Sequence, residues 1–267
     1  MNRSPRRIVF LYWRLFSQQL KAMMEYSADF YIMIGAAAMT QITGFLFLWV
    51  VFSRIPDIQG WQFWEVAFMY AVVYVSEGIG SLFFEGTWRM LRLVNMGELD
   101  HYLVRPMPIA LQIFCTGIGM NGLGNIVIGG TIMVLALSHI EIAWSLTTVG
   151  MAVVLLGSAM IIRVAINLAA NCSAFWIRNS GNAFPIMIHN LSEFAKYPMT
   201  IFSQGLQLFI SIVVPFAFVS FVPAAALFGK ASWSYLGWFS PLVALYCWGF
   251  ALLLLRIGLR RYESAGN

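Results

Sequence analysis

The stretch at residues 85–108, EGTWRMLRLVNMGELDHYLVRPMP, is among the longest mainly polar intervals of a very apolar sequence. Apolar segments flank it on both sides, and within it lie Arg89, Arg92, Glu98, Asp100, His101 and Arg105. A charged loop between two membrane spans must lie at a water-facing surface, where a soluble partner can bind it. We interpret it as the place where an external energy source acts on the membrane-embedded part of the chain.

The loop has two predicted parts. Trp88, Leu91 and Val94 recur at i, i+3 and i+6, which predicts a helix that prolongs the preceding span. Gly97 is expected to end this helix, and residues 98–103 then form a short helical knob before Arg105 and Pro106. Apolar side chains interleaved with acids and a tyrosine suit docking into a groove of a soluble domain. The alternative is an ordinary solvated loop.

The composition excludes a soluble fold. Of the 267 residues, 60% are hydrophobic and only 10% are charged, and the mean hydropathy is +0.78. Several runs exceed the roughly 20 residues that a helix needs to cross the hydrocarbon core. The prediction is an all-α polytopic membrane protein that forms one transmembrane domain over residues 1–267. We expect the three cysteines to be small buried hydrophobes, and we expect no metal site.

The expected elements follow in order along the chain. Residues 1–29 should contain an amphipathic helix on the membrane surface, because Arg7, Arg14 and Lys21 fall on one side of it. Residues 86–108 form the water-facing loop. Six spans are expected at about residues 30–52, 63–84, 109–137, 146–175, 201–222 and 236–255. The polar stretch at 177–198 is read as a loop on the same side as the central one, and 223–235 as a short re-entrant piece or a plain external loop.

Basic residues predict the orientation. With the N-terminus inside, thirteen Lys and Arg residues fall in cytoplasmic segments, whereas only Arg54 and Lys230 fall in outer loops. This is a strong positive-inside bias, and it puts both termini and the central loop in the cytoplasm. The cytoplasmic set includes Arg178 and Lys196.

Candidate chemistry is sparse. No GxxxxGK[ST] phosphate-binding loop is present, and the three histidines lack partners at metal-ligand spacing, so each is read as a solvated surface residue. Arg163 lies within the fourth span, and Asn167 and Asn171 follow it on the same helix face. This stripe could line a substrate path or bond a partner subunit, or Arg163 could extend to the headgroups. Glu77, in the second span, could pair with Arg163.

The run at residues 96–108, MGELDHYLVRPMP, resembles the Gly-x-Leu-Asp-x-Tyr-Leu-x-x-Pro signature of ABC-2 type export permeases. A closer resemblance within this family is to a branch of drug- and viologen-exporter-like permeases, whose tail is similar to the RRYESAGN ending of this chain. The resemblance extends to the layout, with an N-terminal interfacial helix, six spans and a coupling helix between the second and third spans.

This resemblance implies a membrane subunit that catalyses nothing itself. It implies a separate ATP-binding cassette subunit that binds ATP and Mg, a second permease that is a copy or a relative, and contact with membrane lipids of the bacterial cytoplasmic membrane. No nucleic-acid partner is expected. The ATPase-coupling residues carried over from the signature and its neighbours are Gly97, Glu98, Leu99, Asp100, Tyr102, Leu103, Arg105 and Pro106. Two other functions stay open: an ion-coupled carrier that uses Glu77 and Arg163, and a membrane scaffold that transports nothing.

Overall fold

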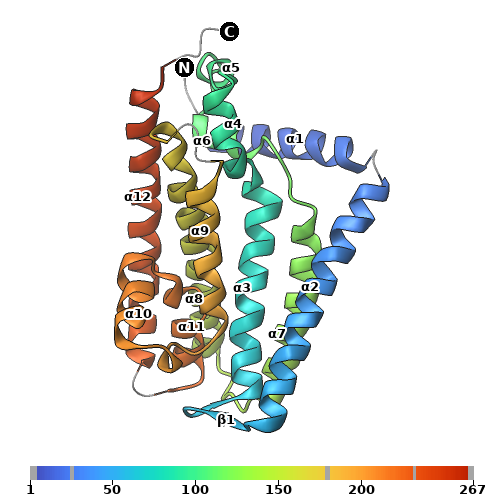
Figure 1. Ribbon diagram of the computed structural model, residues 1–267, viewed down its shortest axis with the longest axis vertical. Coiled ribbons are helices and arrows are strands. Elements are labelled where there is room, and N and C mark those ends of the chain that lie inside the picture. Colours follow the sequence, from blue (N-terminus) through green and yellow to red (C-terminus); the bar gives the residue numbers. More distant parts are fainter. Residues whose placement is uncertain (1–4, 25–26, 178–180, 231–232, 264–267) are drawn as a thin grey trace.

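The structure is a computed structural model that describes residues 5–24, 27–177, 181–230 and 233–263. Three features of the sequence analysis lie outside these residues: residues 1–4 and 25–26 of the N-terminal segment, Arg178, and residues 264–267 of the tail motif. The described chain is a bundle of long helices (Figure 1). Five helical stretches within it are long and apolar enough to cross a membrane: Tyr31–Arg54, Phe63–Asn95, Asn121–His139, Leu146–Phe175 and Ser234–Arg261. The all-α polytopic membrane fold is thereby confirmed.

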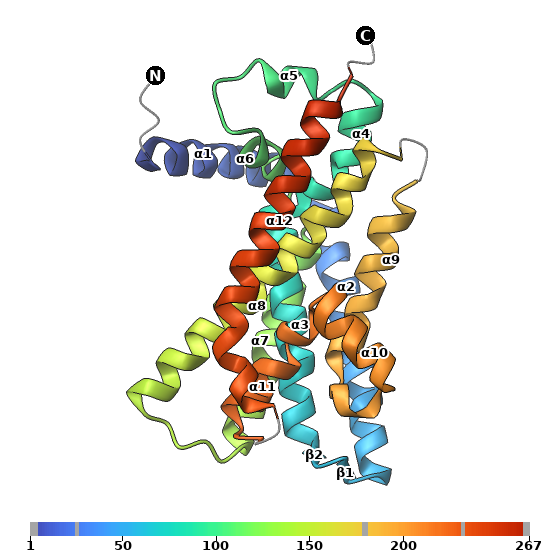
Figure 2. The same cartoon turned by 90° about the vertical axis from the view of Figure 1, so that its left-hand side faces the viewer.

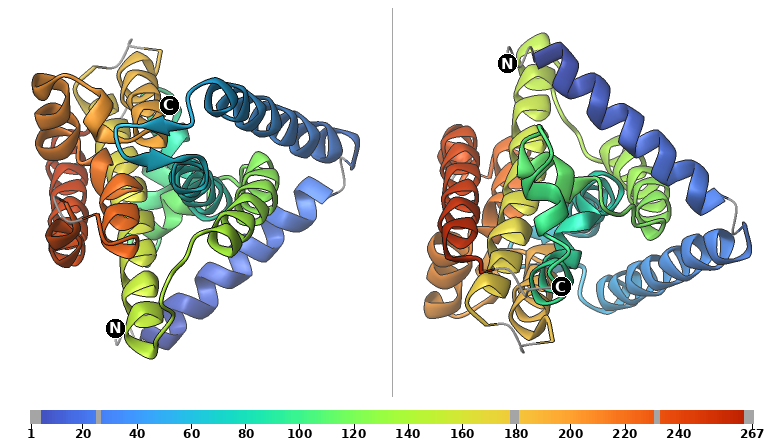
Figure 3. Two further views of the ribbon diagram at one scale, coloured as in Figure 1. Left: turned by 90° about the horizontal axis from the view of Figure 1, so that it is seen from below. Right: turned by 90° about the horizontal axis from the view of Figure 1, so that it is seen from above.

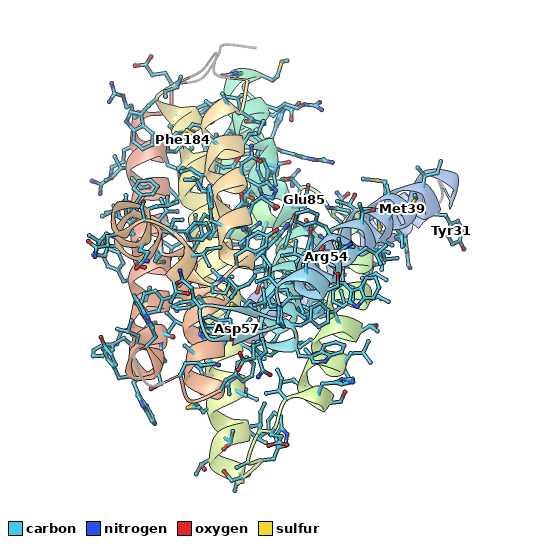
Figure 4. All side chains as sticks on the ribbon, turned by 60° about the horizontal axis from the view of Figure 1, so that its bottom comes forward. Tyr31, Met39, Arg54, Asp57, Glu85 and Phe184 are labelled. Atoms are coloured by element: carbon cyan, nitrogen blue, oxygen red, sulfur yellow. The ribbon has the colours of Figure 1, made fainter. Side chains whose placement is uncertain are left out.

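Helix α3 (Phe63–Phe84) forms the centre of the bundle, and its bounds agree with the predicted second span. Seen along the long axis, α2 (Ser27–Arg54) and α7 (Asn121–His139) stand on one side of α3 (Figure 3). On the other side stand α8 (Leu146–Asn171), α9 (Ala183–Leu191) and α12 (Ser240–Arg261). Helix α2 is peripheral: Tyr31 and Met39, both 71% exposed, lie on its outer part (Figure 4). Such exposed apolar side chains fit contact with lipid.

The two ends of the bundle differ. Figures 1 and 2 place α5 (Asp100–Leu103) and the last turns of α12 at one end, which we call the α5 end. Helix α1 (Pro5–Met24) lies crosswise to the long helices near this end, as expected of an interfacial helix. A two-stranded hairpin, β1 (Asp57–Ile58) and β2 (Trp61–Gln62), marks the opposite end, which we call the hairpin end. There the Lys230 ammonium lies 2.9 Å from the Glu65 carboxylate.

The predicted third span is not one continuous helix. It consists of α6 (Ile109–Phe114) and α7, separated by a segment without helix at residues 115–120. This segment packs tightly against the start of the central loop, because a Cβ at Gly86 would clash with the Thr116 hydroxyl. The Gly119 amide donates to the Ser81 carbonyl oxygen at 2.8 Å. Glycines at these positions let two backbones approach closely, and the chain leaves the helix to follow that surface.

The prediction of the fifth span at 201–222 is wrong. That region is broken into α10 (Gln204–Leu208), a π-helical turn η5 (Phe209–Val213), a 3-10 turn η6 (Phe216–Phe218) and α11 (Phe221–Leu227). Pro215 stands between η5 and η6, where it can neither donate to the preceding turn nor continue a helix. The apolar run therefore folds into short helices near the hairpin end instead of one span (Figure 2).

Residues 181–198, which the sequence analysis assigned to a cytoplasmic loop, pack against the bundle instead. Helix α9 and the 3-10 helix η3 (Ser192–Lys196) run beside α3 and α8 (Figure 1). The turn η4 (Met199–Ile201) follows. The Lys196 ammonium donates to the hydroxyl of Tyr74, midway along α3, at 2.8 Å. Lys196 is thus buried at the depth of the bundle centre and does not contribute to the positive charge of the α5 end.

Glycines set the close crossing of α3 and α7. A Cβ at Gly122 would lie 2.6 Å from the Gly78 carbonyl oxygen, whereas a Cβ at Gly130 on the same helix would meet nothing within 4 Å. We expect Gly122→Ala to lower the free energy of unfolding by about 1–3 kcal/mol, because the two backbones must move apart. Gly130→Ala is the matched control and should change it by less than about 0.5 kcal/mol. Thermal unfolding of the two variants in detergent measures the difference, and equal stabilities would contradict this account of the crossing.

Candidate functional site

The central loop forms a helical arm at the α5 end. The 3-10 helix η1 (Glu85–Arg89) and α4 (Met90–Asn95) prolong α3, as predicted. Gly97 ends this helix with a φ of 69°, a left-handed conformation that glycine adopts without strain. The knob that follows contains α5, and residues 104–108 lead from it back to α6. The predicted helix, its glycine break and the short second helix are all present.

The signature residues divide into an inner and an outer set. Leu99 is fully buried against the rest of the chain, and its amide donates to the Leu93 carbonyl oxygen at 3.1 Å. Tyr102 is half-buried, while Leu103 is 44% exposed and Val104 is 84% exposed. Leu99 therefore anchors the knob to α4, and the side chains available to a partner come from the following turn. The sequence analysis did not single out Val104, because its exposure depends on how the knob folds back.

Polar contacts hold the knob in its orientation. The side-chain amide of Gln112 on α6 donates to the carbonyl oxygens of Tyr102 and Met107, each at 3.0 Å. The Arg105 guanidinium lies 5.3 Å from the centre of the Tyr102 ring. Arg92 and Glu98 form an ion pair at 3.1 Å, but both are exposed, so this pair contributes little stability. The knob is thus tied mainly to α4 and α6.

The predicted polar stripe on α8 contacts the root of this arm. The Asn167 side chain donates to the Thr87 hydroxyl in η1 at 2.9 Å. The Asn171 side chain, one turn on, donates to the carbonyl oxygen and to the side-chain oxygen of Asn167, both at 2.9 Å. Asn167 and Asn171 therefore connect α8 to the start of the loop within one chain.

Glu77 and Arg163 form the ion pair that the sequence suggested. The Arg163 Nη2 and Glu77 Oε2 atoms are 3.3 Å apart, and the Arg163 side chain is only 7% exposed. Arg163 therefore does not extend to a headgroup region. His189 on α9, expected to be a solvated surface residue, lies against the pair instead, with its Nε2 atom 3.8 Å from Glu77 Oε1. A small cavity of about 40 Å³ adjoins these three side chains and Phe216, and it is large enough for water.

The sequence analysis missed a second ion pair, in which the Lys196 side chain is 6% exposed and the Glu193 side chain is 58% exposed. The Lys196 ammonium contacts both carboxylate oxygens of Glu193 at 2.6 Å, and it lies 4.3 Å from the centre of the Tyr74 ring. The Tyr70 hydroxyl, one turn along α3, donates to the Gln41 carbonyl oxygen on α2 at 2.7 Å. The signal was the spacing of His189, Glu193 and Lys196 at i, i+4 and i+7, which predicts one polar face on a helix that is otherwise apolar.

Helix α1 contacts the α5 end of α3. The Tyr12 hydroxyl donates to the Phe83 carbonyl oxygen at 2.8 Å, and the Phe16 and Phe83 rings stack with centroids 5.2 Å apart. Burial raises the pKa of the Tyr12 hydroxyl, so this group stays protonated and remains a donor. These contacts join α1 to the last turn of α3, from which the arm continues.

Within the described ranges, no group of three or more His, Cys, Asp or Glu side chains is placed to hold a metal ion. A family model described as "ABC-2 family transporter protein" matches residues 38–266 of the chain. No curated protein and no solved structure matches it.

Proposed function

The chain belongs to the ABC-2 transporter protein family, and from this premise we propose that it is the permease subunit of an ATP-driven exporter. It forms the membrane path for an amphipathic small molecule or a lipid-like substrate, as in multidrug efflux from a bacterial cytoplasmic membrane. A separate ATP-binding cassette subunit binds ATP and Mg and hydrolyses the nucleotide, so the chain itself needs no catalytic residues. A second permease, either a copy or a relative, completes the path.

The observation that carries this proposal is the arm at the α5 end. It is continuous with α3, the central helix, and it presents Leu103 and Val104 to the solvent beyond the bundle. Exposed apolar side chains that lie away from the lipid-facing surface favour a protein partner. A force applied to the knob reaches α3 through η1 and α4 without crossing a flexible linker. We therefore place the α5 end in the cytoplasm, in agreement with the positive-inside bias.

The coupling residues then act in three ways. Leu103, with Glu98, Asp100 and Arg105, provides side chains for contact with the ATPase. Leu99 and Tyr102 fix the knob on α4 and α6. Gly97 and Pro106 shape the turns on either side of the knob. Val104 joins the first set because it is the most exposed apolar side chain of the loop.

The substrate path runs along the side of α3 that faces α9. Glu77, Arg163 and His189 lie there, and Asn167 and Asn171 extend this polar line to the root of the arm. The ion-coupled carrier is the weaker alternative, because Glu77 is held by Arg163 and a carrier needs a carboxylate free to exchange its ion. The scaffold alternative leaves this buried polar line without a role.

The first experiment isolates the chain from its native membrane in mild detergent and identifies its partners. We expect a soluble protein with a GxxxxGK[ST] loop to be recovered with it. Vesicles that contain the recovered complex should take up substrate only when ATP is supplied. Transport by vesicles that contain this chain alone, driven by a proton gradient, would contradict the proposal and favour the carrier. Recovery of a partner without a nucleotide-binding loop would favour the scaffold.

A further inference from the structure

A groove on the outer face of the molecule lies between the broken helices and α12. It has a volume of about 560 Å³ and lies among α10, η5, the 3-10 helix η7 (Ser234–Phe239) and the first turns of α12. Figures 1 and 2 place α10 level with the half of α3 nearer the hairpin end. The lining residues that matter here are Gln204, Gln207, Ser211, Trp233 and Tyr246. The groove is separate from the cavity beside Glu77, with which it shares no lining residue.

The groove exists because the chain breaks its helix at this point. The π-helical turn η5 widens the backbone, and Pro215 prevents it from continuing as a regular helix against α12. A gap remains between η5 and the start of α12, with Phe218 at its inner side. Turns of this kind are frequent at functional sites, because they leave space and backbone groups that a regular helix would close.

The groove opens among lipid-facing side chains. Leu208 is 59% exposed, Ile212 71%, Leu242 61% and Tyr246 69%. These apolar groups lie beside the groove on α10, η5 and α12, and α12 is part of a stretch long and apolar enough to cross a membrane. An occupant therefore enters sideways from the membrane and carries an apolar tail.

The polar lining is unusual for such a position. Gln204 and Ser211 bond to no other side chain or carbonyl group among the described residues, and Gln207 uses only its Nε2 atom, which donates to the Phe202 carbonyl oxygen at 2.8 Å. Polar side chains that open toward hydrocarbon cost free energy unless a partner satisfies them. Amides and hydroxyls both donate and accept, so they match a ligand whose groups do the same.

The composition of the groove's lining favours an uncharged lipid headgroup over a charged one. None of its residues is charged, whereas sites for phosphate-bearing lipids rely on Lys and Arg. The Trp233 and Tyr246 rings offer flat apolar surfaces with a polar edge, which suit a ligand that is apolar on one face and hydroxylated at its rim. We propose that this groove binds an amphiphile with an uncharged, hydroxyl-rich headgroup, such as that of a glycosyl lipid, which enters from the membrane. The site depends only on the membrane fold and not on coupling to an ATPase.

The test uses the full chain in lipid nanodiscs of phosphatidylethanolamine and phosphatidylglycerol. The probe is a glucosyl diacylglycerol with a diazirine on its acyl chain, and labelled peptides are identified by mass spectrometry. We expect labelling near Trp233 and Tyr246, and we expect Gln204→Met combined with Ser211→Ala to reduce it about tenfold, because two hydrogen bonds are lost. Gln207 is left unchanged because it bonds the chain's own backbone. Thermal unfolding confirms that the double variant is folded.

A second groove in the same chain serves as the control for the labelling experiment. It has a volume of about 630 Å³, lies between α2 and α3 and is lined by Phe45, Leu46, Trp49, Phe52, Ser53, Phe63 and Trp64. This second groove is almost entirely apolar, so Ser53→Ala should leave its labelling by the glucosyl probe unchanged. The glucosyl probe should also label this groove no better than a phosphatidylglycerol probe does. Unlabelled glucosyl lipid should displace the probe from the first groove, whereas free glucose should not. Equal labelling of the first groove by both probes, or competition by free glucose, would overturn the proposal.

Discussion

Replacing Leu103 and Val104 together with aspartate is expected to abolish recovery of the ATP-binding subunit and with it ATP-driven transport. Both side chains are exposed at the tip of the arm, 44% and 84% respectively. Truncating a central apolar anchor of an interface costs at least about 2 kcal/mol, and two buried carboxylates without partners add to this. The affinity should therefore fall by more than about thirtyfold. Substitutions at exposed positions change stability by only about 0.5 kcal/mol, so the bundle should remain folded.

Leu99→Ala provides the matched comparison at the same knob. Leu99 is fully buried, so its truncation removes packing between the knob and α4 rather than a contact with the partner. We expect the arm to lose about 2–5 kcal/mol of local stability, which faster hydrogen exchange of its amides would show. Recovery of the ATP-binding subunit with the variant should fall only in part. The measurement is co-purification from detergent together with ATP-driven uptake in vesicles. Undiminished recovery of the ATPase by the aspartate variant would show that the knob is an ordinary solvated loop.

The parts of this site that could be predicted from the sequence are those with local signals. Gly97 ends a helix because of its own backbone freedom, and the i, i+3, i+6 spacing of Trp88, Leu91 and Val94 gives the preceding helix without knowledge of neighbours. The pairing of Glu77 with Arg163 followed from the cost of leaving either charge alone in a membrane. The burial of Leu99 could not be predicted, because it depends on how the knob folds back onto α4.

The prediction of a fifth span at 201–222 was wrong because hydropathy does not register contacts between helices. Hydropathy averages over a window, and the stretch that contains His189, Glu193 and Lys196 looks too polar to enter a membrane. In the structure His189 and Lys196 contact Glu77, Arg163 and Tyr74 of the bundle. Glu193, whose side chain is 58% exposed, pairs with Lys196 on its own segment. The adjacent run at 201–222 has the higher hydropathy but contains Pro215, which breaks it. These contacts across the bundle, which the sequence does not reveal, let the more polar segment pack against α3, whereas the more apolar run breaks into short helices.

Arg163→Met is expected to be the most destabilising single substitution among the polar residues of the bundle. It leaves Glu77, whose side chain is only 19% exposed, without the cation that lies 3.3 Å from it. Removing one partner of a buried pair costs about 3–5 kcal/mol, because the remaining charge stays buried and uncompensated. His189 can offset part of this loss, since it lies 3.8 Å from the same carboxylate and can bind a proton. Unfolding of the purified chain in increasing sodium dodecyl sulfate measures the change.

The double variant Glu77→Gln with Arg163→Met separates structure from transport chemistry. If the pair serves only to hold α3 against α8, removing both charges should restore most of the stability, because no uncompensated charge remains. ATP-driven transport should then persist in the double variant at a rate near that of the original chain. An ion-coupled carrier predicts the opposite, since it needs the Glu77 carboxylate itself. A double variant that is stable and still binds the ATPase, yet moves no substrate, would show that the two side chains act on the substrate in the proposed path and do not only hold the helices together.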